Sequence, residues 1–188
     1  MLSVARYVST TQLPPNQYVV RAATAPDADA IRALATENGM FDPDDMDGFD
    51  EMMGGYLSGM LDRQAWIVAT YDTGIAGAAY YAPEPFADRL WNLYFLAVLP
   101  GGHRSGAGGE LIRWVEQTLC QLGEEQARVL IVETSGTDPY AQARAFYAKH
   151  GFDEEARIRE FYGPGDHKIV FWKALPTNRA SNKATANR

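Results

Sequence analysis

The sequence predicts an α/β domain with a mixed central sheet that helices flank. Ala127–Thr134 is short and almost entirely apolar, which is typical of a strand buried on both faces of a sheet. Ala65–Ala82 has the pattern of two apolar strands joined by a tight turn at residues 72–74. Leu111–Leu122 repeats aliphatic residues at the spacing of an amphipathic helix. Helices of this kind bury their apolar stripe against a sheet.

The start of the chain predicts a strand and then a helix. Gln17–Thr24 is the first strand. Pro26 suits the first position of the helix, and Asp27 and Asp29 suit its positive end. Gly39 ends this helix.

The middle of the chain predicts a second helix, the hairpin described above and a long strand. Gly48–Leu61 has a helical pattern that its glycines weaken. Arg89–Leu99 is the long strand, and it leads into the amphipathic helix that Gly123 ends.

The end of the chain predicts a strand, a helix and a last hairpin. The strand is the apolar segment 127–134. Asp138 is expected to cap the next helix and Pro139 to take its first position, and the helix stops at Gly151. Residues 156–175 form a hairpin around a turn at Gly163–His167. The expected order is therefore β-α-α-β-β-β-α-β-α-β-β.

The length of 188 residues suits one domain, which we place at residues 18–175. Residues 1–17 are expected to form an N-terminal extension, and the polar residues 176–188 a disordered tail. The single cysteine, Cys120, excludes an internal disulfide and lies in an apolar helix, which favours a buried thiol. We find no signal peptide and no apolar run long enough to span a membrane, so a cytoplasmic location is expected.

The net charge of −7 argues against binding to nucleic acid, which needs a basic surface. Six of the carboxylates lie in Phe41–Met53, which has no cationic side chain. This stretch is either a solvated acidic loop or an entrance that attracts a cationic substrate. A third interpretation is a docking site for a basic protein partner.

The segment LAVLPGGHRSGAGGELI, Leu96–Ile112, joins the long strand to the amphipathic helix through a glycine-rich turn. Such a turn predicts an anion cradle, because unpaired N–H groups and the helix dipole face outward and glycine admits a close ligand. No lysine followed by serine or threonine comes after these glycines, which excludes a nucleotide-triphosphate loop. Gly-Ala-Gly-Gly-Glu-Leu at 106–111 lacks the third small residue of the dinucleotide fingerprint.

Two motifs together resemble the GNAT N-acetyltransferase superfamily. The first is Val98-Leu99-Pro100 followed by residues 103–108, which is similar to the family's coenzyme A loop. The second is YAQARAFYAKHGF at Tyr140–Phe152, which is similar to the family's helix with a Phe-Tyr pair and a Gly-Phe end. The resemblance covers about residues 19–175 and includes the order of the elements.

The resemblance implies an acetyl-CoA-dependent N-acetyltransferase that acts on a primary amine of a small molecule or a protein, by direct attack in a ternary complex. It implies that a bulge in the long strand frees backbone groups for the cofactor at Leu96, Ala97 and Val98. The other residues that it implies for cofactor binding are His103, Arg104, Ser105, Gly106, Ala107, Gly108, Gly109, Tyr140 and Ala143. His103 departs from the family's glutamine or arginine, and Tyr140 from its asparagine. Homodimers are common in the family.

Acetyl transfer needs a proton acceptor for the amine, whose pKa is ~10.4 if it resembles lysine, and a proton donor for the leaving thiolate. Tyr147 matches the family's tyrosine general acid. Glu133, which is expected to end an apolar strand next to Thr134, is the candidate base, with Glu84, Asp88 and Tyr162 as rivals.

His150 and His167 lie beside turns without the spacing of metal ligands, so no metal site is expected. The alternative to an enzyme is an acyl-CoA-binding sensor with the same fold and no turnover.

Overall fold

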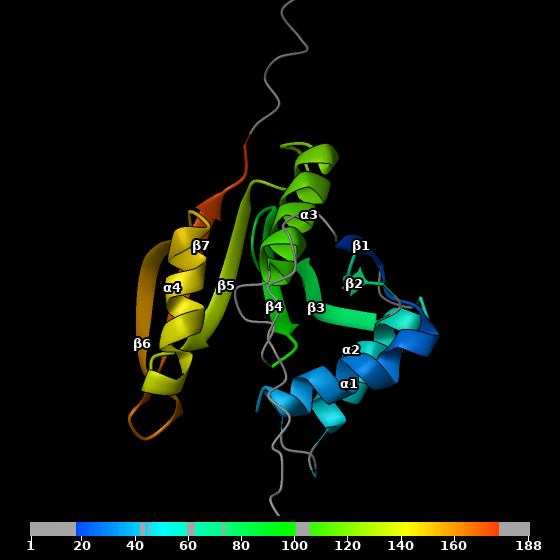
Figure 1. The fold of residues 1–188 in the computed structure, drawn as a ribbon. Coiled ribbons are helices and arrows are strands. Elements are labelled where there is room, and N and C mark those ends of the chain that lie inside the picture. The colour runs from blue at the N-terminus through cyan, green and yellow to red at the C-terminus, as the bar shows by residue number, and fades with distance from the viewer. Residues whose placement is uncertain are drawn as a thin grey trace, which may run out of the picture.

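The computed structural model describes residues 18–41, 44, 46–59, 63–72, 74–100 and 106–176. The predicted extension 1–17 and the predicted tail beyond Pro176 lie outside these described residues. The strands are β1 (Val19–Ala22), β2 (Ala65–Tyr71), β3 (Gly74–Pro83), β4 (Leu90–Val98), β5 (Val129–Ser135), β6 (Asp153–Gly163) and β7 (Asp166–Ala174). The α-helices are α1 (Ala28–Glu37), α2 (Asp47–Leu57), α3 (Ala107–Leu122) and α4 (Ala141–Lys149). The predicted order of strands and helices is confirmed (Figure 1).

The strands form one mixed sheet in the order β1-β2-β3-β4-β5-β7-β6. Every neighbouring pair is antiparallel except β4 and β5, which are parallel. A parallel pair needs a crossover connection, and α3 supplies it between these two strands. This confirms the α/β class and the mixed sheet that the sequence predicts.

A core lies on each face of the sheet. On one face, α3 and α4 bury Leu111, Val115 and Tyr147 against strand residues such as Leu130 and Phe171. On the other face, α1 and α2 cover β2, β3 and β4, with a core that includes Ile31, Phe49, Trp66 and Phe95. Figure 1 places α1 and α2 beside the first half of the sheet and α3 and α4 along the other face.

Both helices that the sequence opens with proline begin as 3-10 turns, at Ala25–Asp27 and Asp138–Tyr140. The prediction that Asp138 caps the second of these is wrong, because Thr137 holds the cap position and Asp138 is the first residue of the turn. Pro139 explains why the turn already includes Asp138, because the fixed φ of proline suits a helical turn.

Asp27 does more than interact favourably with the helix dipole, because its carboxylate also joins β1 to α1 through hydrogen bonds. Its carboxylate accepts two hydrogen bonds from the Arg21 guanidinium, at 2.6 and 2.8 Å, and two more from the backbone N–H and hydroxyl of Thr24, each at 2.8 Å. It thereby ties β1 to the start of α1. The hydrogen bonds from Arg21, and next those from Thr24, hold the pKa of Asp27 well below its usual value although burial opposes this.

Asp27→Asn should lower the free energy of unfolding at pH 7 by about 1–2 kcal/mol, because the amide cannot accept the same set of bonds. Since the pKa of the folded carboxyl is depressed, its contribution is complete above the unfolded pKa of about 3.9 and is lost as the pH falls below it. Urea unfolding between pH 7 and pH 2 would measure this. An equal acid dependence in the variant and the parent would contradict the assignment.

Gly77→Ala should destabilise the sheet by about 1–3 kcal/mol. A Cβ at Gly77 of β3 would lie 2.9 Å from the backbone oxygen of Ala97 in β4, which cannot move without breaking the register. Gly54 in α2 is the matched control, since a Cβ there meets nothing within 4 Å. Gly54→Ala should raise the free energy of unfolding by about 0.5–1 kcal/mol, because alanine favours a helix more than glycine does. Equal effects of the two changes on thermal unfolding would refute the steric argument.

Candidate active site

The separation of β4 from β5 defines the candidate site. The two strands pair over Leu90–Leu93 and Val129–Val132, and no pair between them follows in the described residues. Both strands continue beyond this point, β4 to Val98 and β5 to Ser135, and Figure 1 shows them diverging. Beyond Leu93 the side of β4 that faces β5 therefore presents backbone groups that no strand pairs.

A bulge in β4 lies at the same point. Tyr80 of β3 pairs with Phe95 and Tyr81 pairs with Leu93, so Tyr94 is an extra residue. The resemblance placed the bulge at Leu96–Val98, and the structure corrects this to Tyr94. The reason is the register with β3, which resumes at Phe95 and is regular to Val98.

The three residues Leu96, Ala97 and Val98 follow the bulge along β4. Ala97 is buried in the core beneath α1 and α2, and its two neighbours pack against the core beneath α3. The carbonyl of Val98 accepts a hydrogen bond of 3.0 Å from the side-chain amide of Asn38, just after α1. One backbone acceptor of this stretch therefore already serves the fold.

The glycine-rich turn leads directly into α3. His103, Arg104 and Ser105 lie outside the described residues. Gly106 has a φ of +102°, a conformation that favours glycine, and its carbonyl accepts the first hydrogen bond of the helix, from Glu110. The first turn of a helix carries N–H groups and a partial positive charge that suit an anion.

Gly108 and Gly109 have a packing role that the sequence does not reveal. A Cβ at Gly108 would lie 3.1 Å from Cζ of Phe146, and one at Gly109 would lie 3.0 Å from Cε1 of His150. The glycines thus let the start of α3 approach α4 closely. The same contacts place His150 in helix packing, against the ring of Phe146 with centroids 4.4 Å apart.

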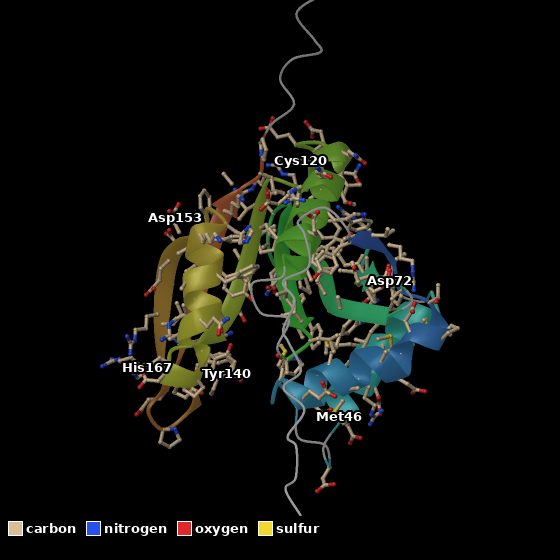
Figure 2. All side chains as sticks on the ribbon, in the orientation of Figure 1. Met46, Asp72, Cys120, Tyr140, Asp153 and His167 are labelled. Carbon is tan, nitrogen blue, oxygen red and sulfur yellow. The ribbon has the colours of Figure 1, made fainter. Side chains whose placement is uncertain are left out.

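Tyr147 lies in the core beneath α4 and is 6% exposed. Its ring packs among those of Phe146, Phe152 and Phe171 at centroid distances of 5.5, 6.0 and 5.6 Å. Burial raises the pKa of its hydroxyl far above the usual range, so the group holds its proton at neutral pH. Ala143 packs against the same core one turn earlier. Tyr140 stands at the start of α4, as Figure 2 shows.

Glu133 points to the opposite face of the sheet, since its neighbour Val132 belongs to the core beneath α3 and α4. It lies within β5, two residues before the strand's last residue and not at its end. Its carboxylate accepts a hydrogen bond of 2.8 Å from the ammonium of Lys168 in β7. The Lys168 ammonium also lies 3.5 Å from the centroid of the Phe161 ring.

The rival carboxylates Glu84 and Asp88 have different surroundings. Glu84 accepts a hydrogen bond of 2.9 Å from the hydroxyl of Tyr94, the bulge residue. Asp88 is held by Arg89 and Arg128 before the parallel pairing of β4 and β5 begins, so the structure separates it from the opening. Glu84, and not Asp88, therefore reaches the residues at the opening.

The charge of Glu133 affects the pKa of two tyrosines on this face, Tyr94 and Tyr162. Burial, then the hydrogen bond to Glu84 and the negative charges of Glu84 and Glu133, raise the pKa of Tyr94 well above its usual range. Burial is the main cause that raises the pKa of Tyr162 to about 12, and Glu133 adds to it. We name Glu84, Tyr94, Glu133, Phe161, Tyr162 and Lys168 the Glu133 cluster.

The sequence did not predict the contacts of Lys168 with Glu133 and Phe161, nor the place of Tyr94 in the bulge of β4. Lys168 begins an apolar run, and only the register of β5 with β7 brings it beside Glu133. An aromatic pair at 161–162 next to a turn was the available signal for an exposed aromatic surface.

The structure describes only part of the acidic stretch Phe41–Met53. Asp42 and Asp45 lie outside the described residues, and Asp44, Asp47, Asp50 and Glu51 are exposed. Asp50 accepts a hydrogen bond of 2.5 Å from Arg32 of α1, so one of these charges serves to join the two helices.

Other expectations concern histidine, cysteine and metal. Within the described part of the chain, no group of three or more metal-ligating side chains is found. His167 accepts a hydrogen bond of 2.9 Å at Nδ1 from the N–H of Glu160. Cys120 is half-buried and its pKa is raised, mainly by burial. No helix among the described residues has the length and apolar content to cross a membrane.

The chain matches the model of the acetyltransferase (GNAT) domain over residues 62–154. A protein assigned to the GNAT acetyltransferase family from Desulfovibrio desulfuricans is 32% identical, with 85% of this chain and 99% of that chain covered and a TM-score of 0.76. No curated protein sequence matches the chain significantly.

Two more distant structures share the fold. The ribosomal-protein-S18-alanine N-acetyltransferase of Escherichia coli is 18% identical, with 87% of this chain and 97% of that chain covered and a TM-score of 0.67. A GNAT acetyltransferase from Elizabethkingia anophelis with acetyl-CoA bound is 15% identical, with 85% and 99% covered and a TM-score of 0.64.

Tyr147 should remain protonated when ordinary tyrosines ionise, because the charged phenolate would be buried among aromatic rings. Absorbance titration of the parent and Tyr147→Phe should therefore give the same number of ionising tyrosines up to about pH 11. Loss of one titrating tyrosine in the variant below that pH would show that the hydroxyl is accessible to solvent.

Proposed function

The chain belongs to the GNAT superfamily of N-acetyltransferases, and from this premise we propose that it transfers the acetyl group of acetyl-CoA to a primary amine by direct attack in a ternary complex. The observation that carries the proposal is the opening between β4 and β5. Tyr147 is buried in the core on one face of the sheet, and the two carboxylates Glu84 and Glu133 lie on the other.

The start of α3 is the proposed site for the cofactor's pyrophosphate. Amides of Gly106–Gly109 and of the preceding His103–Ser105 would bind it, because a helix N-terminus favours an anion. Arg104 would add a permanent positive charge. Backbone groups of Leu96–Val98 would contact the pantetheine arm beyond the bulge. Tyr140 and Ala143 of the α4 segment complete the proposed cofactor surface.

Tyr147 is the proposed proton donor to the leaving thiolate. A hydroxyl that keeps its proton at neutral pH can donate it when a strong base forms beside it. Its packing against three aromatic rings fixes its direction, which favours transfer in one geometry.

Glu133 is the proposed base, with Glu84 as its rival. The acceptor amine arrives mostly as an ammonium and must lose a proton before it attacks. Glu133 is 30% exposed on the face of the sheet opposite Tyr147, so it could receive that proton directly or through water. Glu84 is already bound by Tyr94 and better suits binding of the cationic form of the acceptor.

A cationic acceptor fits the charge of this side of the molecule. Glu84 and Glu133 act on the hydroxyls of the exposed Tyr94 and Tyr162, and carboxylates beside aromatic faces attract ammonium groups. Lys168 already lies over the ring of Phe161. Small polyamines and the amino groups of proteins both belong to this class. One structural neighbour is an alanine N-acetyltransferase of a ribosomal protein, which keeps a protein N-terminus among the acceptors to test.

Mixing the protein with acetyl-CoA and a panel of amines should release free thiol in the presence of the correct acceptor. Tyr147→Phe should lower kcat by about 10²-fold, since general acid catalysis contributes at least this much, and should leave acetyl-CoA affinity unchanged by calorimetry. Tyr81→Phe is the matched control, because Tyr81 is also buried in this core, with a raised pKa of about 12, and its hydroxyl bonds Thr118 of α3.

Absence of acetyl-CoA binding in this experiment would overturn the proposed function. Binding with no turnover of any amine would favour an acyl-CoA-binding sensor, which the engagement of Glu133 by Lys168 also suits. Equal turnover in the parent and Tyr147→Phe would remove Tyr147 from the chemistry.

A further inference from the structure

β6 leaves one long edge of the sheet open. It is the outermost strand, and β7 is its one neighbour among the described strands (Figure 1). All of its residues before Gly163 are exposed. Of the eight exposed large apolar side chains in the described residues, β6 carries three, which are Ile158, Phe161 and Tyr162. An open edge presents backbone donors and acceptors that can pair with another chain.

The charges along this edge are sorted by sign. Residues 153–155 are one aspartate and two glutamates, and the next charged residues, after Ala156, are Arg157 and Arg159. None of these five charged side chains forms an ion pair within the part of the chain that the structure describes. Glu160, which follows, already accepts a hydrogen bond from the N–H of Gly165 in the turn. The edge therefore offers an acidic half and a basic half, both without a partner of opposite charge.

We propose that β6 pairs with β6 of a second copy of this chain, antiparallel about a two-fold axis near Ala156. Identical edges that meet about such an axis run in opposite directions. The acidic residues 153–155 of each copy would then lie opposite Arg157 and Arg159 of the other. Opposite charges on neighbouring strands stabilise their pairing, and like charges destabilise it. This inference does not depend on acetyl transfer.

The same sorting of charge opposes other arrangements. Charged residues on an edge strand usually prevent it from pairing with other chains. On β6, a register slipped by several residues would set carboxylates against carboxylates or arginines against arginines, so the pattern favours one alignment and penalises its neighbours.

The irregularities of β6 limit how far the pairing extends. Its register with β7 shifts between Glu154 and Ala156 and again between Ile158 and Gly163. Such bulges bend a strand and interrupt its edge. Pairing is therefore confined to the stretch around Ala156, and it closes at two copies because each chain contributes its only β6. Backbone hydrogen bonds over a short edge bury a small area, so we expect a dissociation constant on the order of 1–100 µM.

Sedimentation of the full chain over a concentration range that spans this constant should show a reversible change from 20.8 kDa to twice that mass. Glu154→Lys with Glu155→Lys makes the whole edge mainly basic, and Arg157→Glu with Arg159→Glu makes it acidic. Each double variant should weaken self-association by at least about tenfold, because like charges then meet on both sides of the axis. An equal mixture of the two variants should restore a dimer that contains one copy of each.

The matched control is Glu124→Lys with Glu125→Lys. These exposed glutamates lie in the turn after α3, and their exchange changes the net charge by the same amount as the basic edge variant. The control should self-associate like the parent. Equal weakening in the control would reduce the effect to net charge and overturn the proposal.

A monomer throughout this range would also overturn the proposal, and so would a dimer that neither edge variant weakens. Two variants that stay folded by circular dichroism but do not associate when mixed would refute the antiparallel arrangement. Amide hydrogen exchange of the parent provides a readout that needs no variant. Exchange at residues 153–159 should slow as the dimer forms, while β1, at the other edge of the sheet, should not change. Unchanged exchange in β6 would exclude backbone pairing of this edge.

Discussion

The parallel pairing of β4 with β5 is the constraint on which the other features depend. Antiparallel neighbours need only a turn, but a parallel pair needs a crossover, and α3 provides it. The crossover helix must begin near the carboxyl end of β4, where the two strands separate after Leu93. Topology therefore places a helix N-terminus beside a gap in backbone pairing, and ligands of α/β sheets bind at such carboxyl ends.

The close approach of α3 to α4 brings the first turn of α3 against the helix that carries Tyr147. Gly108 and Gly109 leave room for Phe146 and His150, so the first turn of α3 rests on the helix that carries Tyr147. Helix packing therefore already requires small residues here. The proposed approach of a phosphate to the backbone would place a second requirement for glycine on the same turn.

The sequence predicted the order of elements because periodicity, prolines and glycines are local signals. It also placed Tyr147 in a helix and a helix start after the glycine-rich turn, through motifs that stay within one helix and its flanking turn. It failed where a contact joins distant strands: the bulge at Tyr94 depends on register with β3, and Lys168 meets Glu133 only through β7. Register is set by packing of the whole sheet, so no short stretch encodes it.

The sheet also places the proposed proton donor and the candidate bases on opposite faces. The proposed donor, Tyr147, lies in an aromatic core where burial opposes loss of its proton. The carboxylates lie on the opposite face, one bound by Lys168 and one by Tyr94. In the proposed function they act on one reacting centre through the opening between β4 and β5, which begins where the pairing of these strands stops at Leu93.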